Sequence, residues 1–453
     1  MALSISKAVE RIKSDLFSIL PADIIMALCR QLNYRWRDRC LNPVTTIQAF
    51  LLQILHGNVA CDHVSHLMGR RFTGEAYCQA RSRLPLELFQ RLLTTVCTAL
   101  ASCTDSARWL GHRVWLIDGS SCSTSDTKSL QKAFGQPGNQ RKGCGFPVVH
   151  LLALFDCGTG LLLRISAAPL RTHDLSLIAA MHAEMTRGDV LVGDRGFCSY
   201  GHFGLLFQAG IHGLFRLHQA TIVSFHKRRR HAGNQPKGSR KKSKGLPKSR
   251  WIQSLGKLDQ IVEYFKPKSC PAWLSYEEYA RLPDTLRLRE LRYRVQKPGF
   301  RTRDVTLVTT LLDPHKYSKE ELAALYAKRW QVETHLKHLK QTLGMDTLRT
   351  KSPDNILKEL CMYVLVYNLV RLVMLDASRR QQVPMSRISF IDALRSLRHA
   401  LPGSQPRPLN TIPARPGRFE PRVRKRRPKQ FSVMIRARSW YRKRKTSTCS
   451  AQS

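Results

Sequence analysis

The sequence predicts an α/β core with a β-rich insertion, an all-helical region before it, and helices and a basic tail after it. Three observations support this. Apolar residues recur at helical spacing up to about residue 105, short β-rich runs follow, and a basic stretch rich in Gly, Pro and Ser interrupts the α/β pattern. With 43% hydrophobic residues, the 453-residue chain has enough apolar material for two or three domains.

The first two segments are predicted from their hydrophobic periods. Residues 1–105 form a helical N-terminal region, with apolar residues on one helix face at Ile47, Phe50, Leu51, Ile54 and Leu55. Residues 106–218 form the first part of the core. There the runs RVWLID, GFPVVHLLALFD, LLLRISAAPL and DVLVGD predict strands, with a helix from about 173 to 187 before the last of them. The predicted order is β-β-β-α-β.

The remaining segments complete the predicted organisation. Residues 219–303 form the β-rich basic insertion, and residues 304–400 form the second part of the core, with a strand at DVTLVTTLL and two long helices. These helices are predicted at roughly 318–343 and 353–375. Residues 401–453 form a Pro- and Arg-rich tail.

The charge of the chain predicts a polyanionic partner. The 75 Lys and Arg residues outnumber the 32 acids, which gives a net charge of +43. Residues 226–250 contain 11 Lys/Arg and no acid, and the tail contains 15 Lys/Arg and one acid, Glu420. Such runs can be merely solvated, but the lack of compensating acids favours contacts with DNA phosphates. An anionic membrane surface is the less favoured partner, because no single amphipathic helix carries the charge.

The cysteines and apolar runs indicate a soluble, cytoplasmic protein. The 13 cysteines include no Cys-x-x-Cys pair, so reduced thiols are expected; Cys61, His63 and His66 form the nearest approach to a zinc cluster, and helix packing explains them better. The N-terminus lacks the apolar run of a signal peptide. The stretch MYVLVYNLVRLVML is interrupted by Asn and Arg and is predicted not to span a membrane.

Two aspartates stand where predicted strands end. Asp118 ends RVWLID, and Asp194 ends DVLVGD. Side chains at the carboxyl ends of neighbouring strands meet at one edge of an α/β sheet, so two carboxylates there predict a divalent-metal site. The alternative for either aspartate alone is that it caps a turn or helix.

A third carboxylate lies in the predicted helix 318–343. At 100° per residue, Tyr326, Arg329, Glu333 and Lys340 lie within about 60° of one another, beside an apolar face. A solvated helix with i,i+4 charge pairs would show the same pattern. Geometry alone leaves both interpretations open.

With these residues in place, the sequence resembles a known family. The spacing Tyr326-x2-Arg329-x3-Glu333-x6-Lys340, behind IDGS and DRGF, is similar to the DDE-type insertion-sequence transposases that carry the Tyr-Arg-Glu-Lys signature. Further segments typical of that family cover nearly the whole chain: AYCQARSRLP, FGQPGNQRKGCGFPVVHLLALFD, TTLLDP, LRTKSP, YNLVR and PRVRKRRPK.

The resemblance implies a ribonuclease H-like catalytic core and a mechanism. The expected reaction is metal-dependent DNA cleavage at the ends of an insertion sequence, followed by strand transfer into target DNA (cut-and-paste transposition). Two Mg²⁺ ions are expected, with Mn²⁺ able to substitute. By resemblance, the catalytic residues and metal ligands are Asp118, Asp194 and Glu333, and the DNA-binding residues are Tyr326, Arg329 and Lys340.

The resemblance also implies the partners. These are double-stranded DNA, as terminal inverted repeats and target, and a second copy of the chain in a homodimeric synaptic complex at the bacterial nucleoid. The helical region 1–105 is expected to recognise the terminal repeat, although no clean helix-turn-helix signature is present. Family members commonly cut the second strand through a hairpin. Trp251 and Trp273 are candidates by position to stack on a flipped base, and the core is the alternative place for each.

Two other functions share these features. A catalytically silent or co-opted DNA-binding protein would keep the charge, but the intact carboxylates disfavour it. A ribonuclease H-like nuclease without strand transfer would keep the carboxylates, but the full-length signature and the tail disfavour it.

Overall fold

The computed structural model describes most of the chain outside its basic segments. The described residues are 20–104, 106–141, 143–218, 223–227, 249–295, 304–399 and 407–413, with Arg436 and Trp440. Most of the basic run 226–250 and of the basic tail therefore lies outside the described residues.

Five helices form the N-terminal part of the described chain: α2 (Ala22–Gln31), α3 (Pro43–Leu55), α4 (Cys61–Met68), α5 (Gly74–Arg83) and α6 (Leu86–Cys103). Local capping sets several of their ends. The Asn42 side chain accepts from the Thr45 N–H before Pro43 at the first position of α3, and Thr73 caps α5 in the same way. Gly69, with φ 59°, ends α4 in the left-handed region.

Five strands form the core sheet in the order β3-β2-β1-β4-β5. β2 pairs with β1 and β3 in antiparallel register, whereas β4 runs parallel to both β1 and β5. This mixed order confirms the predicted ribonuclease H-like core. Its strands are β1 (Val114–Thr124), β2 (Val148–Asp156), β3 (Leu162–Pro169), β4 (Val190–Gly193) and β5 (His212–Arg216).

Short helices connect these strands: α7 (Lys128–Phe134), α8 (Ile178–His182) and α9 (Tyr200–Ala209). The helix predicted at about 173–187 is shorter than expected. It begins as a 3-10 turn, Asp174–Leu177, and becomes α-helical only over α8. The His173 side chain accepts from the Leu175 N–H and thereby sets the start of the turn.

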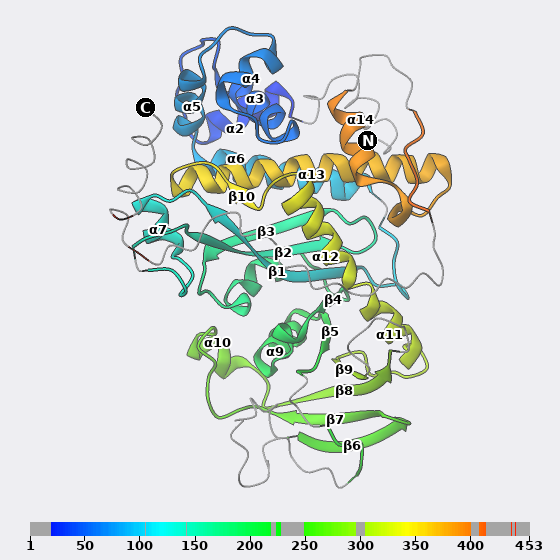
Figure 1. Cartoon of the computed structure of the whole chain (residues 1–453). Coiled ribbons are helices and arrows are strands. Elements are labelled where there is room, and N and C mark those ends of the chain that lie inside the picture. The colour runs from blue at the N-terminus through cyan, green and yellow to red at the C-terminus, as the bar shows by residue number, and fades with distance from the viewer. Residues whose placement is uncertain are drawn as a thin grey trace.

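The insertion and the strand that follows it continue the core sheet. β9 (Asp304–Thr309) pairs with β5, and β8 (Thr285–Arg294), β7 (Asp259–Phe265) and β6 (Ser249–Gly256) follow in antiparallel order, with α10 (Tyr276–Arg281) beside them. Together with β10 (Thr347–Leu348), which pairs with β1, they make one ten-stranded sheet (Figure 1). Buried Arg289 of β8 makes a bidentate pair with Asp259 at 2.8 and 2.5 Å and donates to the Tyr317 carbonyl at 2.6 Å.

The predicted single helix 318–343 is wrong. It is divided into α11 (Lys319–Ala327), α12 (Trp330–Lys337) and a π-helical turn, His338–Thr342. Between α11 and α12, the amides of Arg329 and Val332 bond carbonyls three residues back, at Tyr326 and Arg329. This tighter, 3-10-type winding interrupts the α-helix. The period of apolar residues in the sequence does not reveal such a change in hydrogen bonding.

α13 (Pro353–Gln381) is the central core helix, and α14 (Phe390–Arg398) packs beside it. Figure 1 shows α13 between the N-terminal helices and the sheet. By length and composition alone α13 could cross a membrane, with a mean hydropathy of 1.7 in its most apolar window, but that window is 100% buried inside the protein. Asn368 accepts from the Leu162 N–H at 2.9 Å, and Arg371 donates to the Thr159 carbonyl, so α13 holds the β2–β3 turn.

Two stacked histidines lie in the core behind the β4–α9 connection. His202 is fully buried, and its Nδ1–H donates to the Phe197 carbonyl at 2.8 Å. Because a carbonyl only accepts, His202 Nε2 must accept the Nε2–H of His182, 3.1 Å away. Burial lowers the pKa of His182 to about 4 and that of His202 to about 3, from an ordinary value of 6.5. The neutral pair supports the turn that follows Asp194.

Acid should therefore destabilise the protein. The unfolded chain takes up protons at these histidines near pH 6.5, whereas the folded chain does so only near pH 4 and below, so stability is complete above pH 6.5 and declines between pH 6.5 and 4. His182 alone accounts for up to roughly 3 kcal/mol at the acid end. Denaturant unfolding across this range should show a shallower pH slope for His182→Gln and the wild-type slope for the exposed control His66→Gln. Equal slopes in all three proteins would contradict the assignment.

Candidate active site

The parallel pairing of β1 and β4 places two aspartates at the same level. Leu116 is paired with Val192, and two residues further along each chain stand Asp118 and Asp194. Asp118 Oδ1 accepts from the Gly119 N–H at 2.9 Å, and Asp194 Oδ1 accepts from the Gly196 N–H at 2.7 Å. Each carboxylate is thus oriented by its own turn.

Glycines beside both aspartates permit a close approach of other side chains. A Cβ atom on Gly119 would lie 2.6 Å from Asp174 Oδ1, and one on Gly193 would lie 2.8 Å from the Phe197 ring. His150 Nε2 holds Asp174 Oδ1 at 2.8 Å, on the side of β1 opposite Asp118. This support cannot be predicted from the sequence, because no local motif connects Asp174 with residue 119.

Arg329, just before α12, joins the two parts of the site. Its Nη1 lies 3.6 Å from Asp118 Oδ2, and its Nη2 lies 3.2 Å from Glu333 Oε1. The Arg329 side chain is only 13% exposed. Burial and the nearby charge of Asp194 raise the pKa of Asp118 to about 6, with a smaller increase from Glu333, while Arg329 opposes the shift. The site therefore has an excess of negative charge that Arg329 neutralises only in part.

Two further predicted residues flank this group. Tyr326 is buried, and burial raises its pKa to about 12, so its hydroxyl remains a hydrogen-bond donor at neutral pH. Lys340 lies on the π-helical turn and pairs with Asp346 at 3.1 Å. The structure therefore brings Tyr326 and Arg329 to the carboxylates. Lys340 lies beside a later part of β1, because its partner Asp346 accepts through its carbonyl from the Ser123 N–H. Lys340 is thus paired with an acid outside the predicted group of Tyr326, Arg329 and Glu333.

A second arginine at the same sheet edge was also missed. Arg216 ends β5, one residue beyond Phe215, which pairs with Gly193. Its Nη2 is buried without a hydrogen-bond partner in the described part of the protein. Its charge lowers the pKa of Tyr326, although burial raises that pKa by more. The only sequence signal was its position at a strand end.

The carboxylates suit a hard divalent cation by donor type, since all three supply oxygen ligands. Within the described ranges, however, no three His, Cys, Asp or Glu side chains stand close enough together to hold a metal ion. Arg329 instead lies between Asp118 and Glu333 and pairs with both. The same finding covers Cys61, His63 and His66. Cys61 instead contacts the Cys78 sulfur at 3.1 Å.

The two candidate tryptophans lie in the insertion. Trp273 packs against Gly201 and the apolar residues around Leu274, which is a core position. Trp251 lies on β6, the strand farthest from β3 in the sheet order, and Lys227 stands 6.0 Å from its ring centroid. No described contact connects either ring with the carboxylates.

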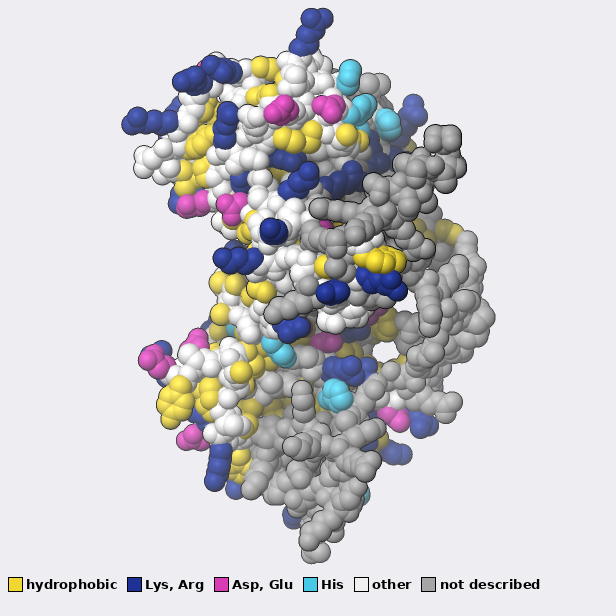
Figure 2. Space-filling view, turned by 60° about the vertical axis from the view of Figure 1, so that its left-hand side comes forward, with side chains coloured by type: hydrophobic (Ala, Val, Ile, Leu, Met, Phe, Trp, Pro, Cys, Tyr) yellow, Lys and Arg dark blue, Asp and Glu magenta, His cyan; other side chains and the backbone are white. Residues whose placement is uncertain are grey.

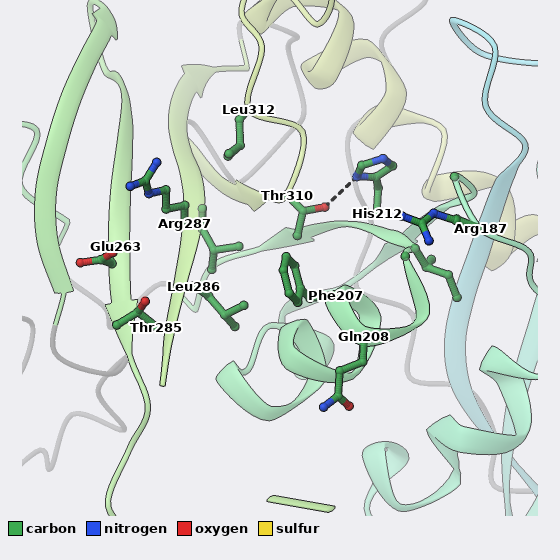
Figure 3. A pocket seen from close by; sticks show the side chains of 14 residues that line it. Arg187, Phe207, Gln208, His212, Glu263, Thr285, Leu286, Arg287, Thr310 and Leu312 are labelled. Atoms are coloured by element: carbon green, nitrogen blue, oxygen red, sulfur yellow. Dashed lines mark hydrogen bonds between the residues drawn. The ribbon is translucent and has the colours of Figure 1, made fainter. Parts of the chain in front are cut away.

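A pocket of about 900 Å³ lies away from this site. Its lining includes Gly188 and His212, which stand at the starts of β4 and β5, whereas Asp194 follows the end of β4. Figure 3 shows Arg187 and Arg287 on opposite sides of it, with the ring of Phe207, a residue of α9, between them. The carboxylates follow the opposite ends of these strands, so the pocket and the carboxylate site are different parts of the protein.

Comparison with known proteins identifies the family of the chain. The transposase DDE domain family matches residues 109–369, which contain all three carboxylates. The chain belongs to the DDE transposase family and is a catalytic transposase. It is 25% identical over 378 residues to the transposase InsG for insertion sequence element IS4 of Escherichia coli (strain K12), covering 79% of this chain and 77% of that protein. A piggyBac transposase in a synaptic complex with hairpin DNA is 12% identical, with a TM-score of 0.46 over 86% of this chain and 79% of that chain.

The close approach at Gly119 makes a specific prediction. In Gly119→Ala the new methyl group must displace Asp174 or the β1 backbone, so Asp118 moves and DNA cleavage should fall by about 10²-fold. The matched control is Gly138→Ala, because a Cβ there meets nothing within 4 Å and the backbone needs no positive φ. Cleavage rates and melting temperatures of both variants test this; wild-type cleavage by a folded Gly119→Ala protein would contradict it.

Proposed function

We propose that this transposase cleaves DNA at the ends of its own insertion sequence and joins the freed 3′ ends to target DNA, with two divalent cations held by Asp118, Asp194 and Glu333. The observation that carries the proposal is that Arg329 pairs with both Asp118 of β1 and Glu333 of α12, while Asp194 follows the end of β4, the strand that lies beside β1. Mg²⁺ is the proposed ion and Mn²⁺ its substitute, because both accept oxygen ligands. When bound, such ions activate a water or 3′ hydroxyl and stabilise the leaving oxygen.

The residues around the carboxylates supply the contacts to DNA. Arg329 now balances Asp118 and Glu333, and a cation at those carboxylates would free its planar guanidinium to bind a phosphate with two hydrogen bonds. Arg216 offers a buried donor without a partner among the described residues, at the same edge. The protonated Tyr326 hydroxyl and Lys340, once released from Asp346, would add contacts on either side.

The proposed partner is double-stranded DNA, first as terminal inverted repeat and then as target. The net charge of +43 supports a polyanion, and the basic run 226–250 and the tail 401–453 would add affinity that does not depend on base sequence. The helical N-terminal region 1–105 would recognise the repeat. Two copies of the chain would hold the two ends in a synaptic complex, in the cytoplasm at the nucleoid.

The carboxylates should matter for chemistry and not for DNA affinity. Asp118→Asn, Asp194→Asn and Glu333→Gln should each reduce cleavage by about 10³-fold or more, while binding to end DNA stays the same or rises slightly as negative charge is lost. The matched control is Glu320→Gln, an exposed acid on α11 outside the site. Nicking assays and gel-shift titrations on end duplexes measure both effects. Substantial nicking by Asp194→Asn would refute the assignment.

Metal binding can be measured apart from activity. Calorimetric titration of the protein on end DNA with Mn²⁺ should give a binding heat that Asp118→Asn loses and Glu320→Gln keeps. Ca²⁺ should support DNA binding with little cleavage, because its longer and looser bonds misplace the reacting groups. Cleavage that persists in excess EDTA would rule out the metal mechanism.

A further inference from the structure

Three N-terminal helices form a compact unit outside the family-matched region. α3 and α4 pack together, and α5 follows α4 after a turn at residues 69–73. The N-terminus of α5 sits tightly on α4: the Gly74 N–H donates to Asp62 Oδ1 at 3.1 Å, and a Cβ on Gly74 would lie 2.2 Å from that oxygen. Two short helices, a tight turn and a supporting third helix make a helix-turn-helix arrangement, in which the second helix of the pair is the one that reads DNA.

One face of α5 is fixed against α3 by polar contacts. The Tyr77 hydroxyl and Arg81 Nη1 both donate to Gln53 Oε1 at 2.9 Å, and all three side chains are buried. These contacts set the rotation of α5 about its axis, so the residues on its opposite face point to solvent in a defined direction.

The outward face of α5 carries a ladder of polar side chains. Glu75, Gln79 and Arg83 are exposed at i, i+4 and i+8. Gln79 donates to Glu75 at 3.3 Å, and Arg83 donates to Gln79 at 3.1 Å. Ala76 is also exposed on this face and adds no bulk. Glutamine and arginine are the side chains that bind the major-groove edges of adenine and guanine with two hydrogen bonds.

An extended arginine segment, residues 34–39, runs beside this face. Tyr34 and Trp36 turn inward and stack with ring centroids 6.3 Å apart, so Arg35, Arg37 and Arg39 alternate with them on the exposed side. A cleft of about 590 Å³ separates the segment from α5 and is lined on the helix side by Ala76, Gln79, Ala80 and Arg83. Figure 2 shows Lys and Arg side chains across this upper, N-terminal part of the molecule.

We propose that α5 is a recognition helix that enters the major groove of duplex DNA, where Gln79 and Arg83 contact base edges and the arginine segment contacts phosphates. A helix of ten residues is about 15 Å long and fits the groove, which is about 12 Å wide. That the duplex is the terminal repeat of the element rests on the proposed function. The DNA-binding surface, in contrast, is inferred from α5 and the arginine segment alone.

The chemistry of the surface favours duplex DNA over single strands or an acidic protein. Binding to single strands requires aromatic faces that are free to stack on bases. Tyr34 and Trp36 line the cleft, but they stack on each other and pack against the core. The nearby acids, Asp38 and Glu75, are each hydrogen-bonded to an amide side chain, of Asn42 and Gln79. Four exposed arginines, Arg35, Arg37, Arg39 and Arg83, outnumber these two acids, so the net charge of the surface is positive.

The test uses full-length protein and two duplexes: one from the inverted repeat that flanks the gene, and one of the same composition in shuffled order. Gln79→Ala and Arg83→Ala should weaken binding to the repeat by about 10- to 100-fold and leave the shuffled duplex nearly unchanged. Arg83→Lys keeps the charge but loses the planar fork, so it should behave like Arg83→Ala on the repeat. All three changes suit an exposed helix, and circular dichroism verifies that the variants are folded.

The arginine segment should behave differently. The double change Arg35→Ala and Arg37→Ala should weaken binding to both duplexes alike and reduce the slope of log K against log[salt] by about 0.9 for each phosphate that is no longer neutralised. Arg91→Ala, an exposed arginine on α6 paired with Glu87, is the control and should leave both affinities and the slope near wild type. Equal losses on both duplexes for Arg83→Lys, or wild-type discrimination by folded Gln79→Ala and Arg83→Ala, would overturn the proposal.

Cleavage assays separate this proposal from the proposed function. If α5 reads the repeat, its variants should recover cleavage at saturating protein concentration, because the carboxylates are intact. If wild-type protein binds the repeat with discrimination that depends on Gln79 and Arg83 but never cleaves it, the proposed function fails and the recognition helix stands. If wild-type protein cleaves the repeat and the α5 variants discriminate normally, the recognition helix fails alone.

Discussion

The two ion pairs of Arg329 hold the candidate active site together. They join Asp118 on β1 to Glu333 on α12, two elements that are far apart in the chain and would otherwise bring like charges together. Burial first, and then the nearby charge of Asp194, raise the pKa of Asp118, so its negative charge is unfavourable at this position and the pair with Arg329 opposes that effect. Because Arg329 is largely shielded from solvent, its attraction is weakened less by water and salt than that of a surface pair. The same arginine thus stabilises the site, and in the proposed mechanism it would become available when a metal takes over its role.

Several other contacts keep β1, β4 and α12 in the positions that this arrangement needs. Gly119 lets Asp174 support β1 from behind, and α13 fixes the β2–β3 turn through Asn368 and Arg371. The insertion contributes as well, because buried Arg289 links Asp259 to the Tyr317 carbonyl just before α11. Movement of the insertion would therefore also move the start of α11, which precedes Arg329 and Glu333.

The proposed DNA-reading unit is firmly joined to the catalytic core. Asn58, which follows α3, donates to Glu359 of α13 at 2.8 Å, and its carbonyl accepts from Arg349 at 2.6 Å. Glu359 in turn accepts from the backbone N–H of Thr350, in the segment after β10. A duplex bound at α5 would therefore lie in a fixed relation to β10 and its partner β1, which carries Asp118, and this relation would allow recognition of an end to determine where cleavage occurs.

The sequence by itself determined the fold class and the family. Strand periods and strand-end aspartates are local features, and the spacing from Tyr326 to Lys340 is distinctive even though the helix that carries it is not straight. Only the tertiary structure decided that helix 318–343 breaks before α12, that Asp174 and Arg216 approach the site, and that α4 and α5 pair with α3. Those features depend on hydrogen-bond winding, on close contact between distant residues and on the rotation of one helix against another. None of these leaves a periodic trace in the order of the amino acids.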